Sequence, residues 1–110
     1  MGKKDEKLTS ESSKSAEDIQ NRLAGLGNVR VKKMFGGYGI FEGDKMFALI
    51  DSNGRVFFKV DDTNRARFEE SGSEKHSRMP YFSVPVEVLS DDDLLEEWAR
   101  KSIKISKGGK

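Results

Sequence analysis

The amino-acid sequence predicts an α+β fold: an antiparallel sheet of four or five strands with helices packed mainly on one face, in the approximate order α-β-β-β-β-α-β-α. Two tight turns, Gly43-Asp44 and Asn53-Gly54, separate short apolar runs, which is typical of consecutive hairpins. Apolar residues recur at helical spacing near both ends of the chain. The length of 110 residues suits one domain with one core.

The composition narrows the classes of function. Lys and Arg number 20 and Asp and Glu 19, and this balance argues against a protein that binds polyanions over its whole surface. The absence of cysteine excludes disulfides, thiolate metal sites and cysteine nucleophiles, and it fits a reducing compartment. No apolar run approaches the ~20 residues that span a bilayer, and residues 1–15 lack a signal-peptide core. We therefore expect a cytoplasmic protein without membrane contact.

The N-terminal segment is polar, and it predicts a disordered tail over residues 1–14. We expect a single domain over residues 15–105 and a flexible tail over residues 106–110. Ser15 has the position of an N-cap, and the apolar spacing that follows predicts a first helix over about residues 16–25.

The central strands follow from their alternation and turns. Val29 and Val31 alternate with Arg30 and Lys32, which predicts a strand with one apolar and one basic face. A two-residue turn at Gly43-Asp44 would pair three sets of residues across the next hairpin: Glu42 with Lys45, Ile40 with Phe47, and Tyr38 with Leu49. This register assigns seven residues to the core: Tyr38, Ile40, Phe47, Leu49, Val56, Phe58 and Val60.

The same register gives the other face of the sheet an apolar character. We predict a partner face there, formed by Phe41, Met46, Ile50 and Phe57. Because this face is too apolar to remain in contact with water, we expect a partner subunit, a terminal helix or a loop to cover it.

The C-terminal part predicts two helices and a strand. Asp61 or Asp62 caps a short helix that Gly72 ends, and Tyr81–Val84 forms an edge strand before Pro85. Ser90 is the predicted N-cap of the last helix. The apolar stripe of that helix comprises Leu94, Leu95, Trp98, Ala99 and Ile103.

Several of these segments together resemble the N-terminal domain of the TfoX/Sxy family of bacterial competence regulators, from about Ile19 to Ile103. The segments that carry the resemblance are Lys33-Met34-Phe35-Gly36-Gly37-Tyr38-Gly39-Ile40-Phe41, Lys45-Met46-Phe47-Ala48-Leu49, Phe58-Lys59-Val60-Asp61 and Leu94-Leu95-Glu96-Glu97-Trp98-Ala99. The resemblance implies a compact α+β domain without a known cofactor or catalytic residue. In longer family members a second domain follows, and the role in natural transformation is attached to those proteins.

Four patterns suggest chemistry, and each has a simpler structural interpretation. Gly36–Gly39 precedes a strand rather than the helix that a phosphate loop needs. The run from Asp51 departs from a calcium loop at its fifth, sixth and twelfth positions. The acidic runs Asp61-Asp62 and Asp91-Asp92-Asp93 could ligate magnesium, but each stands where a helix is predicted to begin. His76 is the only histidine and lies in the polar loop Ser73–Met79. We therefore predict no catalytic residue, cofactor or metal site, and no small-molecule substrate.

A cluster of basic residues makes nucleic-acid binding a second possible function. Arg22, Arg30, Lys32 and Lys33 occur without an intervening acid, and they could contact nucleic-acid phosphates. The two hypotheses are therefore a non-enzymatic protein-interaction module, as a homodimer or a regulatory adaptor, and a nucleic-acid-binding regulator.

Overall fold

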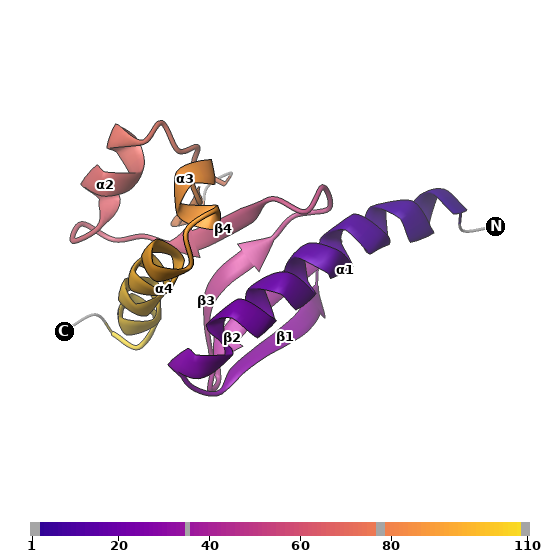
Figure 1. Ribbon diagram of the computed structural model, residues 1–110, viewed down its shortest axis with the longest axis horizontal. Coiled ribbons are helices and arrows are strands. Elements are labelled where there is room, and N and C mark those ends of the chain that lie inside the picture. The colour runs from indigo at the N-terminus through magenta and orange to yellow at the C-terminus, as the bar shows by residue number, and fades with distance from the viewer. Residues whose placement is uncertain (1–2, 35, 77–78, 109–110) are drawn as a thin grey trace.

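The computed structural model describes the backbone of residues 3–34, 36–76 and 79–108, and the side chains of these ranges from residue 11 onward. A five-stranded antiparallel sheet has the order β1-β2-β3-β4-β5 (Figure 1). The strands are β1 (Val29–Met34), β2 (Gly37–Glu42), β3 (Lys45–Ile50), β4 (Val56–Lys59) and β5 (Tyr81–Ser83). The helices are α1 (Lys3–Leu23), α2 (Arg65–Glu70), α3 (Val86–Leu89) and α4 (Asp92–Ser106), with a 3-10 turn at Ala24–Leu26. The predicted α+β class is confirmed.

The main core lies between one face of the sheet and the four helices. Ile19 and Leu23 of α1, and Leu95 and Ala99 of α4, are buried against strand residues such as Phe47. In Figure 1, α1 runs along β1 and β2, and α4 lies beside β3 and β4. Phe68, the one buried residue of α2, packs edge-on against Trp98 with ring centroids 4.7 Å apart, so even this short helix is anchored to the core.

Helix α1 begins at Lys3, well before the predicted start at residue 16. Ser15 is therefore not an N-cap: its hydroxyl donates to the carbonyl of Gly54 at 2.7 Å, and that of Ser12 donates to the carbonyl of Asp51 at 2.5 Å. These two hydrogen bonds attach α1 to the turn between β3 and β4. Residues 3–14 fall within the tail that the sequence predicts to be disordered, and in the structure they belong to this helix.

The C-terminal end is also attached to the fold. Helix α4 runs to Ser106, and the next residue, Lys107, forms an ion pair with Glu42 at the end of β2. The flexible tail predicted for residues 106–110 therefore does not begin at Ser106. Residues 109–110 lie outside the described ranges.

A β-bulge changes the register of the central hairpin. Glu42 lies opposite Lys45, as predicted, but Ile40 lies opposite Ala48 and Tyr38 opposite Ile50. The predicted pairs of Ile40 with Phe47 and of Tyr38 with Leu49 are wrong, because β3 contains one residue more than β2 over this stretch.

The bulge changes the face of the sheet to which three residues of β3 point, namely Ala48, Leu49 and Ile50. Ile50, predicted for the partner face, is buried in the main core with 2% of its surface exposed. Leu49, predicted for the main core, packs instead with Phe57 and Tyr81 on the other face. A shift of one residue reverses the direction of every side chain beyond it.

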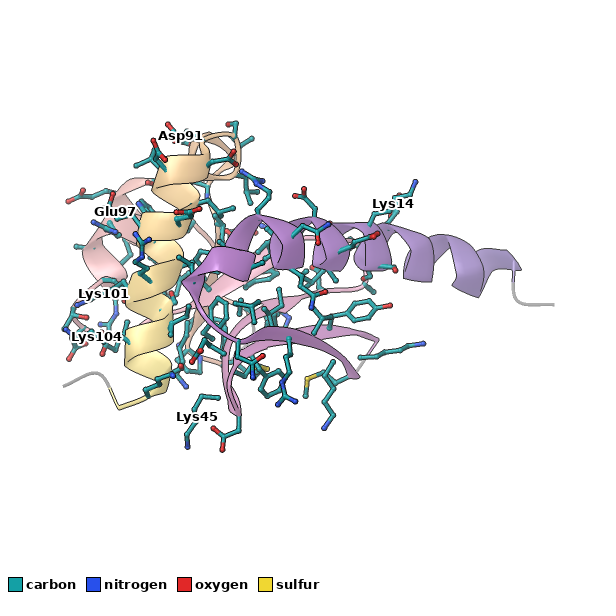
Figure 2. The ribbon with its side chains drawn as sticks, turned by 60° about the horizontal axis from the view of Figure 1, so that its bottom comes forward. Lys14, Lys45, Asp91, Glu97, Lys101 and Lys104 are labelled. Carbon is teal, nitrogen blue, oxygen red and sulfur yellow. The ribbon has the colours of Figure 1, made fainter. Side chains whose placement is uncertain are left out.

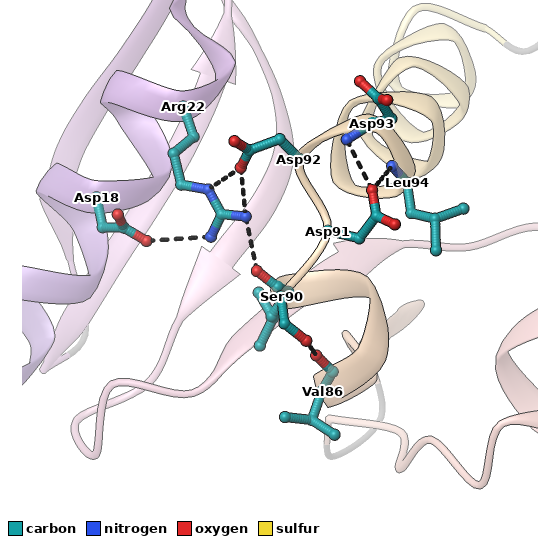
Figure 3. A network of polar contacts seen from close by, with 9 residues as sticks. Asp18, Arg22, Val86, Ser90, Asp91, Asp92, Asp93 and Leu94 are labelled. Carbon is teal, nitrogen blue, oxygen red and sulfur yellow. Dashed lines mark hydrogen bonds and ion pairs between the residues drawn. The ribbon is translucent and has the colours of Figure 1, made fainter.

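The helix caps differ from those predicted. The cap residue of α2 is Asn64, whereas Asp61 accepts hydrogen bonds from Thr63 in the preceding turn. Ser90 ends α3, where its hydroxyl donates to the carbonyl of Val86, and Asp91 caps α4 through the N–H groups of Asp93 and Leu94 (Figure 3).

Candidate functional site

The candidate site is the face of the sheet turned away from the core. Cross-strand pairing places Arg30, Phe41 and Met46 in one row across the strands, and Lys32, Gly39, Leu49 and Phe57 in the next. Together with Met34, the side chains of these rows form the open face, defined as Arg30, Lys32, Met34, Phe41, Met46, Leu49 and Phe57. All four helices contribute buried residues to the opposite side. Figure 2 shows side chains on the side of the strands turned away from α1.

Glycine at position 39 shapes the middle of the open face. A Cβ atom there would lie 2.5 Å from Sδ of Met34 and 2.7 Å from Sδ of Met46. The missing side chain therefore lets two methionines from separate strands approach each other above β2. Beside them lies a cavity of about 360 Å³, whose apolar lining includes Met34, Met46, Leu49 and Met79.

The loop between α2 and β5 covers one half of the open face. The N–H of His76 donates to the carbonyl of Tyr81 at 2.8 Å, and its ring packs edge-on against Phe57 at 4.7 Å between centroids. The guanidinium group of Arg55 lies 5.3 Å from the centre of the Phe57 ring and pairs with Glu74. Phe57 is consequently 3% exposed, whereas Phe41 and Met46, on β2 and β3, remain partly exposed.

Tyr81 closes the small cluster under this loop. Its hydroxyl group reaches across β4 and donates to the carbonyl of Met46 at 3.4 Å. Burial raises the pKa of the Tyr81 phenol, so the group stays neutral and acts as a hydrogen-bond donor. The covered half of the open face is thus part of the fold, whereas the half formed by β1, β2 and β3 carries the partly exposed Phe41 and Met46.

The structure brings together two sites that the sequence treats as separate. Three residues of the predicted partner face, Phe41, Met46 and Phe57, lie on the open face, and so do Arg30 and Lys32 of the predicted basic cluster. Sequence reasoning missed Met34 and Leu49. The alternation of Arg30, Lys32 and Met34 could have indicated Met34, but no sequence signal marks the bulge that turns Leu49 to this face.

The other two basic candidates lie elsewhere. Lys33 alternates to the opposite side of β1, in register with Tyr38. Arg22 belongs to a polar network between α1 and the start of α4 (Figure 3). It donates to the carbonyl of Leu89 at 2.6 Å and to Asp92 at 3.0 Å, and it pairs with Asp18. The four cations therefore do not form one cluster.

The glycine and aspartate motifs have structural roles in this fold. A Cβ atom at Gly37 would collide with the carbonyl oxygen of Ile50, so glycine permits close contact of β2 with the end of β3. The Asp51 carboxylate accepts hydrogen bonds from the N–H groups of Asn53 and Arg55 within the hairpin turn. Across the described ranges, no group of three or more histidine, aspartate or glutamate residues could hold a metal ion. Nor does this part of the chain contain a helix long and apolar enough to cross a membrane.

Comparisons with known proteins identify the family. The family model described as the TfoX N-terminal domain matches residues 21–106, from the end of α1 to the end of α4. The chain is also 39% identical over 59 residues to the DNA transformation protein TfoX1 of Aliivibrio fischeri, an alignment that covers 54% of this chain and 28% of that protein. The resemblance expected from the sequence motifs is confirmed, and the chain belongs to the TfoX N-terminal domain family.

Proposed function

We propose that this domain is a non-catalytic regulatory module that binds a protein partner, a second copy or a different protein, through its open face. The observation that carries the proposal is the partly exposed apolar half of that face, where Phe41 and Met46 stand beside a cavity of about 360 Å³. Contiguous exposed apolar surface marks sites of interaction. Methionine side chains adapt their shape to a partner, which suits such a surface.

The family supports a regulatory role. The similarity to DNA transformation protein TfoX1 suggests that the domain takes part in the control of competence, which would place it in the cytoplasm. Because the alignment spans 28% of that protein, the role in transformation is itself part of the proposal. The edge-on packing of His76 against Phe57 supports a non-catalytic role, since this ring contributes to the fold.

The proposal can be tested by cross-linking the domain to its binding partners in bacterial lysate and pulling down the products. The experiment is done once with nuclease and once without. The test variant is Met34→Gln/Met46→Gln on the open face, and the control is Val86→Gln, which alters an apolar side chain that is 74% exposed on α3. We expect a partner that the wild type and the control retain with nuclease, and that the test variant loses. Equal retention by all three proteins would contradict the proposal. Sedimentation at increasing concentration tests the homodimer version separately.

Nucleic-acid binding is the second candidate. Arg30 and Lys32 are exposed on the open face, where they could contact phosphates. Anisotropy titration of a labelled oligonucleotide at low salt, repeated with Arg30→Ala/Lys32→Ala/Lys33→Ala, tests this function. Absence of binding, or an affinity that the three substitutions leave unchanged, would exclude nucleic-acid binding through these residues.

A further inference from the structure

We infer that the occupant of the open face is an acidic amphipathic segment of a different protein, an inference that rests on the proposed function. Large apolar side chains of the segment would enter the methionine-lined cavity, and its carboxylates would meet Arg30 and Lys32. Three properties of the face carry the inference: the order of side chains along its rows, its charge, and the burial of its aromatic rings.

Each row passes from a cation to apolar side chains. Arg30 stands on the edge strand β1, next to Phe41 on β2 and Met46 on β3. Lys32 stands on the same edge, and beyond Gly39 its row continues with Leu49. A ligand laid across the strands would therefore meet positive charge at the β1 edge and apolar surface further in. An amphipathic segment with acidic residues beside apolar anchors matches this order.

The charge of the open face favours an acidic ligand over a second copy. Neither Arg30 nor Lys32 forms an ion pair with a carboxylate of the described residues. The cation near Phe57, Arg55, is already paired with Glu74. In a two-fold dimer the same patch serves both subunits. Two copies of the open face would supply cations and no complementary acid, and like charges at an interface oppose association.

The aromatic rings of the face favour a protein ligand over a nucleic acid. Proteins that bind single-stranded nucleic acid stack bases on accessible rings. Here Phe57 and Tyr81 are each 3% exposed, so that among the residues the structure describes Phe41 is the partly exposed ring of the open face. The adjacent cavity of about 360 Å³ is lined by three methionines, Leu49 and Ile50, together with Tyr38, Asp51, Ser52 and His76. Its volume lies near the lower end for ligand cavities, which fits one or two anchoring side chains.

A selection from a random peptide library tests the inference. Displayed peptides are selected on the wild-type chain, and those that also bind Met34→Gln/Met46→Gln are discarded. We expect enriched peptides that combine Leu, Phe, Trp or Met with neighbouring Asp or Glu. Enriched peptides that depend on the open face but lack acidic residues would overturn the inference and leave the proposed function intact. A failure to enrich any peptide that depends on the open face would count against both.

Charge reversal on one strand provides the matched comparison. Lys32→Glu should weaken binding of a synthesised acidic peptide by about fivefold, as expected for loss of an exposed ion pair. Lys33→Glu makes the same change on the other side of β1 and should leave the affinity nearly unaltered. Replacing the peptide's glutamates by lysine should restore binding to the double variant Arg30→Glu/Lys32→Glu, in which both cations of the open face are reversed. Equal effects of the two single variants, or no rescue by the lysine peptide, would overturn the inference.

Discussion

Ile40 lies opposite Ala48 across the central hairpin, although the preceding pair joins Phe41 to Met46, so Phe47 is the additional residue of a β-bulge. Both Phe47 and Ala48 belong to the main core. The bulge thereby keeps the side chains of Ile40 and Phe47 in the core while it turns Leu49 outward. It determines which apolar residues belong to the fold and which belong to the open face.

The first prediction concerns the two sides of β3. Ile50→Ala removes a side chain that is 2% exposed in the main core, and it should lower the free energy of unfolding by about 2–5 kcal/mol. Met46→Ala, at the partly exposed end of the same strand, should cost clearly less. Urea unfolding of both variants measures the difference. A similar cost for both would indicate that β3 has the regular register without the bulge.

The second prediction concerns the close approach at Gly37. Gly37→Ala places a methyl group against the carbonyl oxygen of Ile50, which forces β2 and β3 apart and should cost about 1–3 kcal/mol. Gly25→Ala is the control, because an added Cβ atom meets nothing within 4 Å there and the backbone needs no glycine. Thermal unfolding compares the two. Equal melting temperatures would contradict the proposed contact.

The third prediction concerns Gly39 beneath the methionines. In Gly39→Ala the new Cβ atom should displace Met34 and Met46, whose flexible ends can move, so the stability should fall only slightly. Methyl NMR spectra should show large shifts for these two methionines and a smaller one for Met79. Unchanged methyl signals for Met34 and Met46 would show that the two side chains do not meet above Gly39.

The fourth prediction separates Arg22 from nucleic-acid binding. Arg22→Gln removes a hydrogen bond to the carbonyl of Leu89 and should destabilise the protein by about 1–2 kcal/mol. Asp92→Asn should cost less, because the Asp92 side chain is mostly exposed and exposed ion pairs contribute little. Denaturant titration gives both values. A change in oligonucleotide affinity at unaltered stability would contradict the structural role.

The fifth prediction concerns acid stability. The hydrogen bond from Lys107, followed by that from the N–H of Asn28, lowers the pKa of Glu42 below its usual 4.5. The resulting stabilisation is complete above the pKa of the unfolded chain and is lost as the pH falls through the lower pKa of the folded state.

Glu42→Gln should therefore lose less stability than the wild type between about pH 6 and about pH 3. Urea unfolding at a series of pH values measures this dependence. Asp44→Asn, which changes an exposed carboxylate in the adjacent turn, is the control and should follow the wild type. Parallel pH curves for the wild type and Glu42→Gln would show that this carboxylate does not contribute.

The sequence by itself determined the local features of this protein. Turn residues such as Asn53-Gly54 and the alternation in β1 act over a few positions, so the strands, the main helices and the family motifs could be predicted from them. The apolar character of the second sheet face also followed from the sequence. These signals do not depend on contacts with residues that are distant in the sequence.

Only the tertiary structure decided the features that depend on distant partners. Ser15 has a good N-cap sequence, but its hydroxyl bonds to Gly54, which lies 39 residues away, and the helix continues through it. The bulge exchanged Leu49 and Ile50 between the faces, because side-chain direction in a strand reverses with a shift of one residue. The same packing separated Arg22 from Arg30 and Lys32 and placed the latter two beside Phe41 and Met46. Long-range contacts of this kind leave no local pattern in the sequence, and they define the composition of the candidate site.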